Sequence, residues 1–440
     1  MSPGLSAVVM AGGLGTRMRS RTPKHLHELL GRRMIDWVIE AARPLGPTPL
    51  VVVASPATQD AFPGVEVALQ ERPLGTGDAV ACARASLETR AEHVLILAGD
   101  TPLLTTELLE GLVEAHRSQG AAATVLSFRP EDSRSYGRVL RGEEGRLRGI
   151  VEAADATPEQ LAIGEVNSSI YVFVAAKLWP ALERLTPANA QGELYLTDAV
   201  RGLVEAGESV AVHEAPEPHE AEGVNTRVEL AAAAAALRDR INERHMLAGV
   251  TIVDPATTWI GPEVELEPDS TVEPFTSLAG RSRVHSGAHI GPQAVVADAV
   301  VGPGALVGPF CYVRPGTVLE AGAKVGTFVE IKNSHIGAGA KVPHLSYIGD
   351  AEVGDRTNVG AGGITANYPH QPGRPKGRTT IGKDVRTGVH DVFMAPVTIA
   401  DDSWIAASTV ITDDVPPASL AGFPPRQVTK EGYLRERRDD

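Results

Sequence analysis

A run of glycines followed by two cations stands near the N-terminus, and these residue types suit the binding of phosphates. The chain reads Met10-Ala-Gly-Gly-Leu-Gly-Thr-Arg-Met18, and Lys24 follows. Glycines at a strand-to-helix turn let backbone N–H groups approach phosphate oxygens, and the helix dipole adds favourable charge. The glycines alone fit a plain tight turn about as well, because their spacing matches neither a Walker motif nor a dinucleotide fingerprint. Arg17 and Lys24, which can neutralise a triphosphate, favour a nucleotide site.

A carboxylate is expected at the same edge of the fold. The segment 93–100 reads as a buried strand that ends in Asp100. Open α/β sheets bind ligands at the carboxyl ends of their strands. Mg²⁺ bound to nucleotide phosphates takes only one or two protein oxygens, so Asp100 with one partner would suffice. For Asp100 by itself, capping of the next helix near Pro102 is an equally good interpretation.

A third set of polar residues lies in the C-terminal half. His344 stands two residues after Val342, and Tyr347 is close by. A single histidine in a repeat is more often an ordinary surface residue. A histidine among cations, amides and tyrosines better suits a general base beside a sugar phosphate. The other members of this set are Arg314, Lys332, Asn358, Asn367 and Tyr368.

The N-terminal candidates need a scaffold, and the sequence predicts one of alternating strands and helices. Helix-like stretches at 36–42, 78–87 and 105–118 separate several apolar runs. This alternation predicts a Rossmann-like α/β domain with a largely parallel sheet covered by helices on both faces. The runs expected to form strands are 5–10, 50–53, 65–69, 94–97, 122–128, 169–174 and 209–212.

The C-terminal half has a six-residue rhythm instead. From Val284 to Val359, and again from Ile381 to Ile411, an inward-type residue returns almost every sixth position. This period fits neither a helix nor a strand, but it fits a parallel β-helix with three short faces per coil and Gly or Pro at the corners. The residues expected to point inward are Val284, Ile290, Val296, Val301, Val307, Val313, Leu319, Val325, Ile331, Ile336, Val342, Ile348, Val353, Val359, Ile381, Thr387, Phe393, Ile399, Ile405 and Ile411.

These patterns predict three parts: an α/β domain over 1–226, a helical connector over 227–249 and a β-helix domain over 250–440. Six consecutive alanines give the connector high helix propensity. The coil is expected to end near Val415 and to be followed by a tail. The segment 361–378 breaks the rhythm, and a long loop projecting from a rigid repeat is a place where function is expected. The cations of this loop are Arg374, Lys376 and Arg378.

Composition sets limits on the class of protein. The 440 residues are 43% hydrophobic and 22% charged, which indicates a globular chain of two or three domains. The net charge of −14 argues against nucleic acid or an anionic membrane as the main partner. Two cysteines without metal spacing, no signal-peptide pattern and no apolar run of membrane-spanning length predict a cytoplasmic protein.

Further motifs in the N-terminal half follow the order found in the sugar-1-phosphate nucleotidyltransferases, and this half resembles that family. The combination is far more specific than any one motif. The matching segments after the glycine loop are Gln70 with Leu74-Gly-Thr-Gly77, Tyr136-Gly-Arg138, Ile150-Val-Glu152, Glu165-Val-Asn167-Ser168 and Gly223-Val-Asn225-Thr-Arg227.

The resemblance implies roles for these segments. The nucleotide would lie on the glycine loop, Gln70 and the Gly-Thr segment; Asp100 and Asn225 would bind Mg²⁺. A sugar-1-phosphate oxygen would attack the α-phosphorus of UTP and pyrophosphate would leave. Because both reactants are anions, Mg²⁺, Arg17 and Lys24 would act by positioning and charge neutralisation. The nucleotide- and sugar-binding positions are Met10, Ala11, Gly12, Gly13, Lys24, Gln70, Gly75, Thr76, Ala98, Gly99, Asp100, Gly137, Glu152, Asn167, Ser168 and Asn225.

The C-terminal half resembles the hexapeptide-repeat acyltransferases. Together, residues 5–432 resemble the bifunctional UDP-N-acetylglucosamine pyrophosphorylase/glucosamine-1-phosphate N-acetyltransferase family. That family implies a left-handed coil, an exception to the usual right-handed crossover, and a homotrimer. It also implies four small-molecule substrates: UTP, N-acetylglucosamine-1-phosphate, glucosamine-1-phosphate and acetyl-CoA. The product would be a precursor of peptidoglycan and lipopolysaccharide.

By the same resemblance, His344 would take a proton from the glucosamine amine as the amine attacks the acetyl-CoA thioester. Arg314 and Lys332 would hold the sugar phosphate, with Tyr347 and Asn358 nearby. The acetyl-CoA contacts would come from Ala361, Asn367, Tyr368, Val389, Ala407 and Arg426.

The sequence departs from the family's pattern at several of these positions. Val389 stands where the family has a serine, and Pro424 occupies the gap-free position of an expected arginine, with Arg426 two residues on. The Cys-Asn-Tyr-Asp-Gly of many members is here Ala366-Asn-Tyr-Pro-His370, and Ala98 replaces a tyrosine. These differences bear on the acetyl-CoA contacts more than on the two reactions.

Two other interpretations of the C-terminal half stay open. In the first, the chain activates another sugar phosphate and the β-helix serves only oligomerisation or allosteric control; His344 with its Arg and Lys neighbours argues against this. In the second, histidines bind zinc as in carbonic anhydrases, although they share no spacing motif and zinc needs three converging ligands. Those histidines are His285, His289, His335, His344 and His390.

Overall fold

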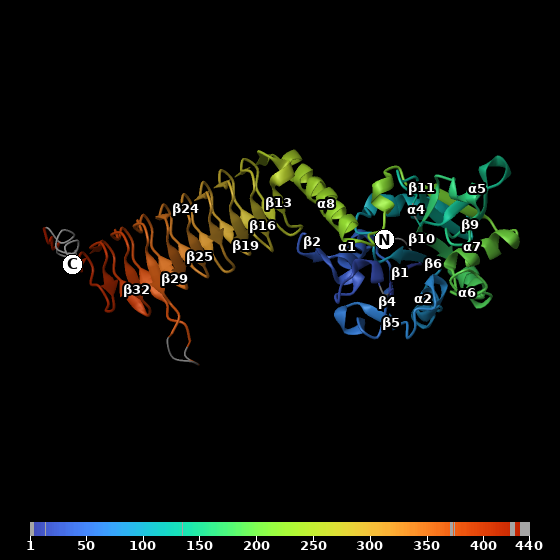
Figure 1. Ribbon diagram of the computed structural model, residues 1–440, viewed down its shortest axis with the longest axis horizontal. Helices are drawn as coiled ribbons and strands as arrows, with labels where there is room; N and C mark the ends of the chain where they lie inside the picture. The colour runs from blue at the N-terminus through green and yellow to red at the C-terminus, as the bar shows by residue number, and fades with distance from the viewer. Residues whose placement is uncertain are drawn as a thin grey trace, which may run out of the picture. The chain divides into compact units, whose positions relative to one another are not determined.

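The computed structural model describes residues 4–13, 15–133, 135–369, 373, 375–422 and 427–431. The chain divides into two compact units, Met1–Leu237 and Arg238–Asp440 (Figure 1). The division falls inside helix α8 (Arg227–Leu247), which covers most of the connector expected at 227–249. Among the described residues, no helix is both long enough and apolar enough to cross a bilayer.

The first unit is built on one sheet with the strand order β11-β7-β10-β6-β1-β4-β5, in which β6, β1, β4 and β5 are parallel neighbours. β1 is a continuous apolar run that is buried along its whole length, as expected for a strand covered on both faces. The strands of this sheet are β1 (Leu5–Ala11), β4 (Leu50–Ala54), β5 (Glu66–Leu69), β6 (His93–Ala98), β7 (Ala123–Phe128), β8 (Arg138–Arg141), β9 (Leu147–Val151), β10 (Val166–Val174) and β11 (Val210–Glu214).

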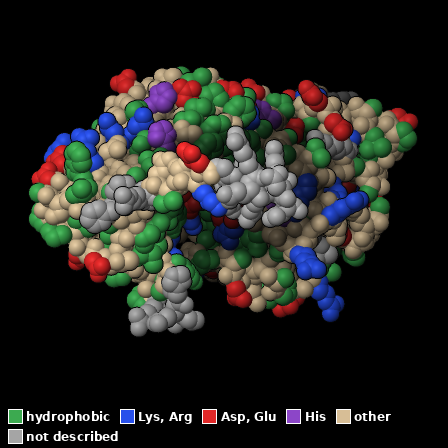
Figure 2. All heavy atoms as spheres, turned by 60° about the vertical axis from the view of Figure 1, so that its left-hand side comes forward, with side chains coloured by type: hydrophobic (Ala, Val, Ile, Leu, Met, Phe, Trp, Pro, Cys, Tyr) green, Lys and Arg blue, Asp and Glu red, His purple; other side chains and the backbone are tan. Residues whose placement is uncertain are grey.

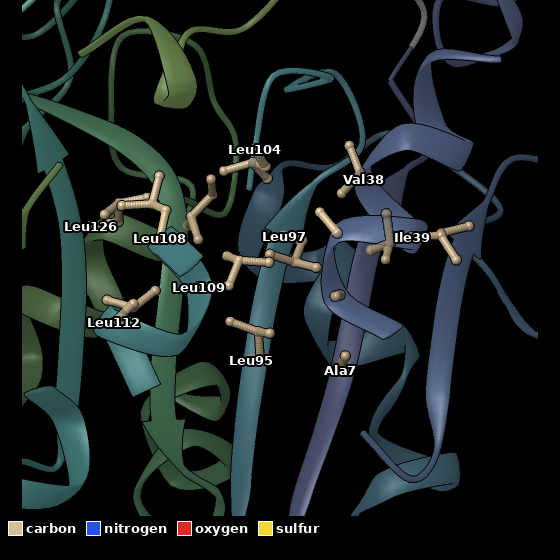
Figure 3. Packing of buried hydrophobic residues seen from close by; sticks show 14 of the residues in the cluster. Ala7, Val38, Ile39, Leu95, Leu97, Leu104, Leu108, Leu109, Leu112 and Leu126 are labelled. Atoms are coloured by element: carbon tan, nitrogen blue, oxygen red, sulfur yellow. The ribbon is translucent and has the colours of Figure 1, made fainter. Parts of the chain in front are cut away.

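Helices cover both faces of this sheet. On one face, α1 (Met34–Ala42) and α4 (Thr106–Ser118) pack against Ala7, Leu95 and Leu97 (Figure 3). On the other face, α2 (Thr76–Cys82), α3 (Arg84–Leu87), α6 (Ala175–Glu183) and α7 (Leu196–Glu205) cover the alternate residues of the same strands. The expected α/β architecture is confirmed.

Three details of the first unit differ from the sequence-based expectation. β10 runs antiparallel to both β6 and β7, which an alternation of apolar runs cannot reveal. The hairpin of β8 and β9, paired at Val139↔Ile150, was not expected because its strands are short. The helix expected at 78–87 is two helices that meet at Ala83.

The second unit is the expected left-handed parallel β-helix, whose strands pair in parallel from coil to coil. One face holds β12 (Thr251–Ile252), β15 (Thr271–Val272), β18 (His289–Ile290), β21 (Leu306–Val307), β24 (Lys324–Thr327) and β27 (Lys341–His344). The next holds β13 (Trp259–Ile260), β16 (Ser277–Ala279), β19 (Val295–Ala297), β22 (Tyr312–Val313), β25 (Glu330–Lys332), β28 (Tyr347–Gly349), β30 (Ile364–Ala366), β32 (Val392–Met394) and β35 (Val410–Ile411). The third holds β14 (Glu265–Leu266), β17 (Arg283–Val284), β20 (Val300–Val301), β23 (Val318–Leu319), β26 (His335–Ile336), β29 (Ala351–Val353), β31 (Thr379–Ile381) and β33 (Val397–Ile399).

The six-residue rhythm marks the interior of the coil. Every residue expected to point inward, from Val284 to Ile411, is buried, including Thr387 and Phe393. Three short faces per coil explain why the period is neither that of a helix nor that of a strand. Stacked rows of aliphatic side chains therefore form the core of this unit.

Two boundaries in the coil need correction. The segment 361–378 is not all loop, because β30 (Ile364–Ala366) continues a face of the coil between β28 and β32. The chain leaves the coil only after β30 (Figure 1), and the Gly377 N–H donates to the Asn367 carbonyl at 3.0 Å across the base of this loop. The coil also continues past Val415, because β36 (Leu420–Ala421) pairs with β34 (Trp404–Ile405).

Candidate active sites

The glycine loop and Asp100 lie at the same edge of the first sheet. β1 and β6 are parallel neighbours with Met10 opposite Ala98, so the residues that follow them emerge side by side. The Gly99 N–H donates to the Met10 carbonyl at 3.0 Å. Asp100 therefore faces the loop at the carboxyl ends of the strands, where the sequence predicted a ligand site.

Four polar side chains meet at this edge. The Lys24 ammonium forms a short ion pair with the Asp100 carboxylate and donates to the Asn225 amide oxygen at 2.7 Å. The Arg17 guanidinium donates to the same Asn225 oxygen at 2.8 Å. Burial opposes ionisation of Asp100, but the interactions with Lys24 and His25 together outweigh it, so the pKa of Asp100 lies below its usual value. The site therefore holds a carboxylate next to two cations.

The start of α8 fixes Asn225. The Thr226 hydroxyl accepts the Glu229 N–H at 3.2 Å, and the Glu229 carboxylate accepts the N–H groups of Thr226 and Asn225. This is a capping box, and Glu229 also lies favourably in the first turn of the helix. The residue before Asn225, Val224, donates its N–H to the Asp100 carbonyl at 2.8 Å, which ties the segment before α8 to the residue that follows β6 and Gly99.

Gln70 and the Gly-Thr segment form a second wall. The Gln70 amide donates to the Gly75 carbonyl at 3.2 Å and to the Asp78 carboxylate at 2.8 Å. A side chain at Gly12 would collide with the Gln70 amide oxygen, so it would displace Gln70 from this wall. The Thr76 hydroxyl accepts the Leu196 N–H at 3.0 Å.

The predicted sugar-binding residues form a third wall. The Glu152 carboxylate accepts a hydrogen bond from the Thr197 hydroxyl at 3.0 Å, and burial raises the pKa of this carboxyl. The Gly137 carbonyl accepts the Asn167 N–H at 2.8 Å, and the Asn167 amide donates to the Tyr171 hydroxyl at 2.7 Å. The Ser168 hydroxyl donates to the Leu126 carbonyl, so it braces the strands behind the wall.

These walls enclose a cavity of about 620 Å³, large enough for a nucleotide and part of a sugar. The predicted residues that line it are Met10, Gly12, Gly13, Arg17, Gln70, Gly75, Thr76, Ala98, Gly99, Asp100, Gly137, Glu152, Asn167, Ser168 and Asn225. Ala11 is buried at the end of β1, and Lys24 reaches the cavity through its hydrogen bonds. His25, Gln191 and Glu193 also line the cavity and were not predicted.

In the second unit, the predicted cations lie on neighbouring coils of one face. The Arg314 guanidinium donates to the Glu330 carboxylate at 2.6 Å and lies over the Tyr312 ring. Lys332, on β25, donates to the Asp350 carboxylate at 3.5 Å. Tyr347, on β28, is the coil-to-coil partner of Glu330. The structure therefore brings Arg314, Lys332 and Tyr347 together.

Asp350 organises this group and was not predicted. Its carboxylate accepts hydrogen bonds from the Asn333 amide at 2.6 Å and from the Asn367 amide at 2.5 Å, in addition to the hydrogen bond from the Lys332 ammonium. Burial opposes its ionisation, but these donors outweigh it and the pKa of Asp350 lies below its usual value. Lys376, from the loop after β30, lies close enough to Lys332 for that ammonium to lower the pKa of Lys376. The three cations Arg314, Lys332 and Lys376 therefore face only two carboxylates, Glu330 and Asp350. The excess positive charge can bind an anion.

The remaining predicted residues lie on the outer surface of one chain. β27 ends at His344, which is exposed. Tyr347 follows three residues later, across a corner of the coil. Asn358 bridges Lys341 and Arg386 on the face of β27. Ala361, Val389 and Ala407 occupy the same corner on successive coils, linked by the bonds His390 N–H to Ala361 and Ser408 N–H to Val389. Tyr368 is exposed beneath Lys376, and Arg426 lies outside the described residues.

The histidines suggested for zinc do not converge. His285 pairs with Glu267 at 2.8 Å, His289 with Glu273 at 3.0 Å, and His335 with carboxylates on two neighbouring coils. Within the part of the chain that the structure describes, no group of three His, Cys, Asp or Glu side chains is placed to hold a metal ion.

Comparison with known proteins shows the family of this chain. The family model of the MobA-like NTP transferase domain matches residues 7–209. Bifunctional protein GlmU of Mycobacterium tuberculosis is 44% identical over an aligned length of 465 residues. The match covers 99% of this chain and 93% of that protein. The chain belongs to the GlmU family. The GlmU proteins of Mycolicibacterium gilvum and Corynebacterium aurimucosum are 44% and 43% identical, and each match covers 98% of this chain and 92% and 94% of the relative.

Membership of the GlmU family decides the class of function. The protein is an enzyme of UDP-N-acetylglucosamine synthesis with a uridylyltransferase and an acetyltransferase activity. The alternative, in which the β-helix is only an oligomerisation or allosteric module, is not favoured. Its substrates are small molecules. On the face shown in Figure 2, acidic and basic side chains are interspersed.

GlmU-type nucleotidyltransferases require a divalent metal ion in general, and the Asp100–Asn225 pair fits one. A carboxylate and an amide oxygen are ligands that hard divalent cations prefer. Both oxygens already contact the Lys24 ammonium, which shows that the pair attracts positive charge. Two protein oxygens suffice when nucleotide phosphates supply other ligands.

Proposed function

We propose that the cavity of the first unit transfers the uridylyl group of UTP to N-acetylglucosamine-1-phosphate, after the β-helix has acetylated glucosamine-1-phosphate. The observation that carries the first assignment is the meeting of Arg17, Lys24, Asp100 and Asn225 at the glycine loop. The observation that carries the second is the cluster of Arg314, Lys332 and Lys376 on the β-helix face next to the one where β27 ends at His344.

In the first reaction centre, an oxygen of the sugar phosphate attacks the α-phosphorus of UTP and the bond to pyrophosphate breaks. Both reactants are anions, so the chain contributes by alignment and charge neutralisation. Arg17 and Lys24 offset the charge of the phosphates, and Glu152 and Asn167 hold the sugar. Mg²⁺, held by Asp100 and Asn225, would supply further charge neutralisation when bound.

In the second reaction centre, the amine nitrogen of glucosamine-1-phosphate attacks the acetyl-CoA thioester carbonyl. His344 accepts the proton that the amine loses, and the CoA sulfur leaves. Arg314, Lys332 and Lys376 bind the sugar phosphate through charge-assisted hydrogen bonds. Ala361, Val389 and Ala407, at one corner on successive coils, form a track along which the extended acetyl-CoA lies.

The β-helix also supports a homotrimer. Phe310, Phe328 and Leu345 form an exposed corner ridge on three successive coils, and the rings of Phe310 and Phe328 stack at 5.3 Å between centroids. Beside this corner ridge lies a trough of about 520 Å³ lined by Tyr312, Tyr347 and Ile364 among others. A contiguous apolar surface of this kind typically contacts another chain. A neighbouring chain in the trough would cover Tyr347, next to the proposed acetyl-acceptor site.

Replacing Phe328 by glutamate is expected to convert the trimer to monomers at micromolar concentration, because three carboxylates would be buried in an apolar contact. Sedimentation-velocity centrifugation measures the change directly. Val228→Glu, an exposed apolar residue of α8, is the matched control and should leave the trimer intact. A trimeric F328E protein, or a monomeric wild type, would contradict the assembly.

Replacing Asp350 by alanine is expected to raise the KM for glucosamine-1-phosphate by about 10- to 100-fold. The amides of Asn333 and Asn367 and the Lys332 ammonium would lose their shared acceptor, and hydrogen bonds to a charged group each contribute about 1.5–3 kcal/mol. Steady-state acetylation kinetics test this. Asp413→Ala, an exposed carboxylate of the same unit, should change nothing, and an unchanged KM in D350A would show that Asp350 is not part of the site.

A coupled assay tests the function as a whole. Glucosamine-1-phosphate, acetyl-CoA, UTP and Mg²⁺ should together yield UDP-N-acetylglucosamine, and the N-acetylated sugar phosphate should do so without acetyl-CoA. If the N-acetylated sugar phosphate gave no product with UTP and Mg²⁺, the assignment of the first unit would be wrong.

We also propose a cytoplasmic location, where these four substrates occur together.

A further inference from the structure

His25 is a buried side chain at the proposed uridylyl site to which the mechanism above gives no role. It lies on the short helix η2 (Lys24–Leu26), next to Lys24, and is 6% exposed. The remaining exposure is toward the nucleotide cavity, because His25 is among the residues that line it. A polar ring in this position faces the substrate and not bulk water.

The orientation of the ring is set by two glycines. A Cβ at Gly99 would lie 3.1 Å from the imidazole Cδ2, and a Cβ at Gly13 would lie 3.9 Å from Cε1. Nε2 is the ring atom between Cδ2 and Cε1. The nitrogen edge of His25 therefore points toward the gap between the glycine loop and the residue before Asp100.

His25 has no hydrogen-bond partner among the described residues, in contrast to other buried histidines of this unit. His116 bonds to His93 at 3.0 Å and to the Thr124 hydroxyl at 2.9 Å. His27 also lacks a partner for Nε2, but His27 does not line the cavity. A buried polar group is normally satisfied, so a partner for His25 is expected to arrive with a ligand.

We propose that His25 is a further substrate-binding residue, whose Nε2–H donates a hydrogen bond to a phosphoryl oxygen of UTP. This inference rests on the proposed uridylyl transfer. Gly13 belongs to the loop assigned to the nucleotide, so a phosphoryl oxygen cradled there would lie beside the nitrogen edge. The imidazole adds a directional donor to the charges of Arg17 and Lys24, which act over longer range. The phosphates are therefore held more precisely in position before the attack.

The test uses the full-length protein with His25→Leu and His25→Gln. His25→Leu is expected to lower kcat/KM for UTP by about 10- to 100-fold, the loss typical of one hydrogen bond to a charged group. The KM for N-acetylglucosamine-1-phosphate and the Mg²⁺ concentration for half-maximal rate should stay within about threefold, because neither contact is removed. His25→Gln keeps a side-chain N–H donor and should recover most of the loss. Calorimetric binding of UTP should weaken by a similar factor.

Controls separate this contact from a packing effect. His27→Leu changes another buried histidine of the same segment, one that does not line the cavity, and should leave kcat/KM for UTP within about threefold. An unchanged KM for N-acetylglucosamine-1-phosphate reports that the first unit of each variant is folded. The proposal is overturned if His25→Leu keeps its affinity for UTP, if His25→Gln recovers nothing, or if only the Mg²⁺ requirement rises. A wild-type protein that makes no UDP-sugar would refute the proposed function instead.

Discussion

Replacing Asp100 by alanine is expected to lower uridylyl transfer by a factor on the order of 10³ or more while acetylation stays within about twofold. The carboxylate is the ion-pair partner of Lys24 and the proposed anionic ligand of the divalent cation. Its removal leaves the largely buried Lys24 without its counter-charge and the phosphates without an aligned cation. Spectrophotometric assays of pyrophosphate release and of CoA release measure the two reactions separately in one preparation.

Two further variants sharpen this result. Asp100→Asn keeps an oxygen for Lys24 but removes the charge, so a similar loss would assign the effect to electrostatics and not to packing. Asp60→Ala, an exposed carboxylate on the same unit, is the matched control and should be as active as the wild type. If D100A lost both activities in a folded protein, the separation of the two reaction centres would be wrong.

Replacing His344 by alanine is expected to do the reverse, with acetylation reduced by about 10²–10⁴-fold, the range typical of a general base. The KM values for acetyl-CoA and glucosamine-1-phosphate should change little, because the proton moves only in the transition state. Uridylyl transfer from the N-acetylated sugar phosphate should be unaffected. His285→Ala, a half-buried histidine of the same β-helix that pairs with Glu267, is the matched control.

The result for His344 also decides between two views of its exposed position. If a neighbouring chain completes the acetyl-transfer site, H344A and F328E should both lose acetylation, and only F328E should change the oligomeric state. If H344A retained acetylation in an intact trimer, the imidazole would be an ordinary surface residue and another group would have to accept the proton.

Much of the fold could be predicted because its periodicities are local. Every residue that the six-residue rhythm from Val284 to Ile411 marked as inward is buried, since each coil repeats the same short chain geometry. The strand-end positions of Gly12 and Asp100 followed in the same way from apolar runs with polar ends. Inside the segment 361–378, β30 was missed because Pro and Gly outside the coil hid three residues that continue it.

The sequence alone determined the two architectures and the residue types of both reaction centres, because hydrophobic period and motif order are properties of short segments. Only the tertiary structure decided which residues meet: Asn225 with Lys24 across 201 positions, Asp350 with Asn367, and His25 between Gly13 and Gly99. It also decided that β10 runs antiparallel to its neighbours. Such contacts depend on how strands pair and where loops return, which is set by packing of the whole unit and leaves no mark in any one segment.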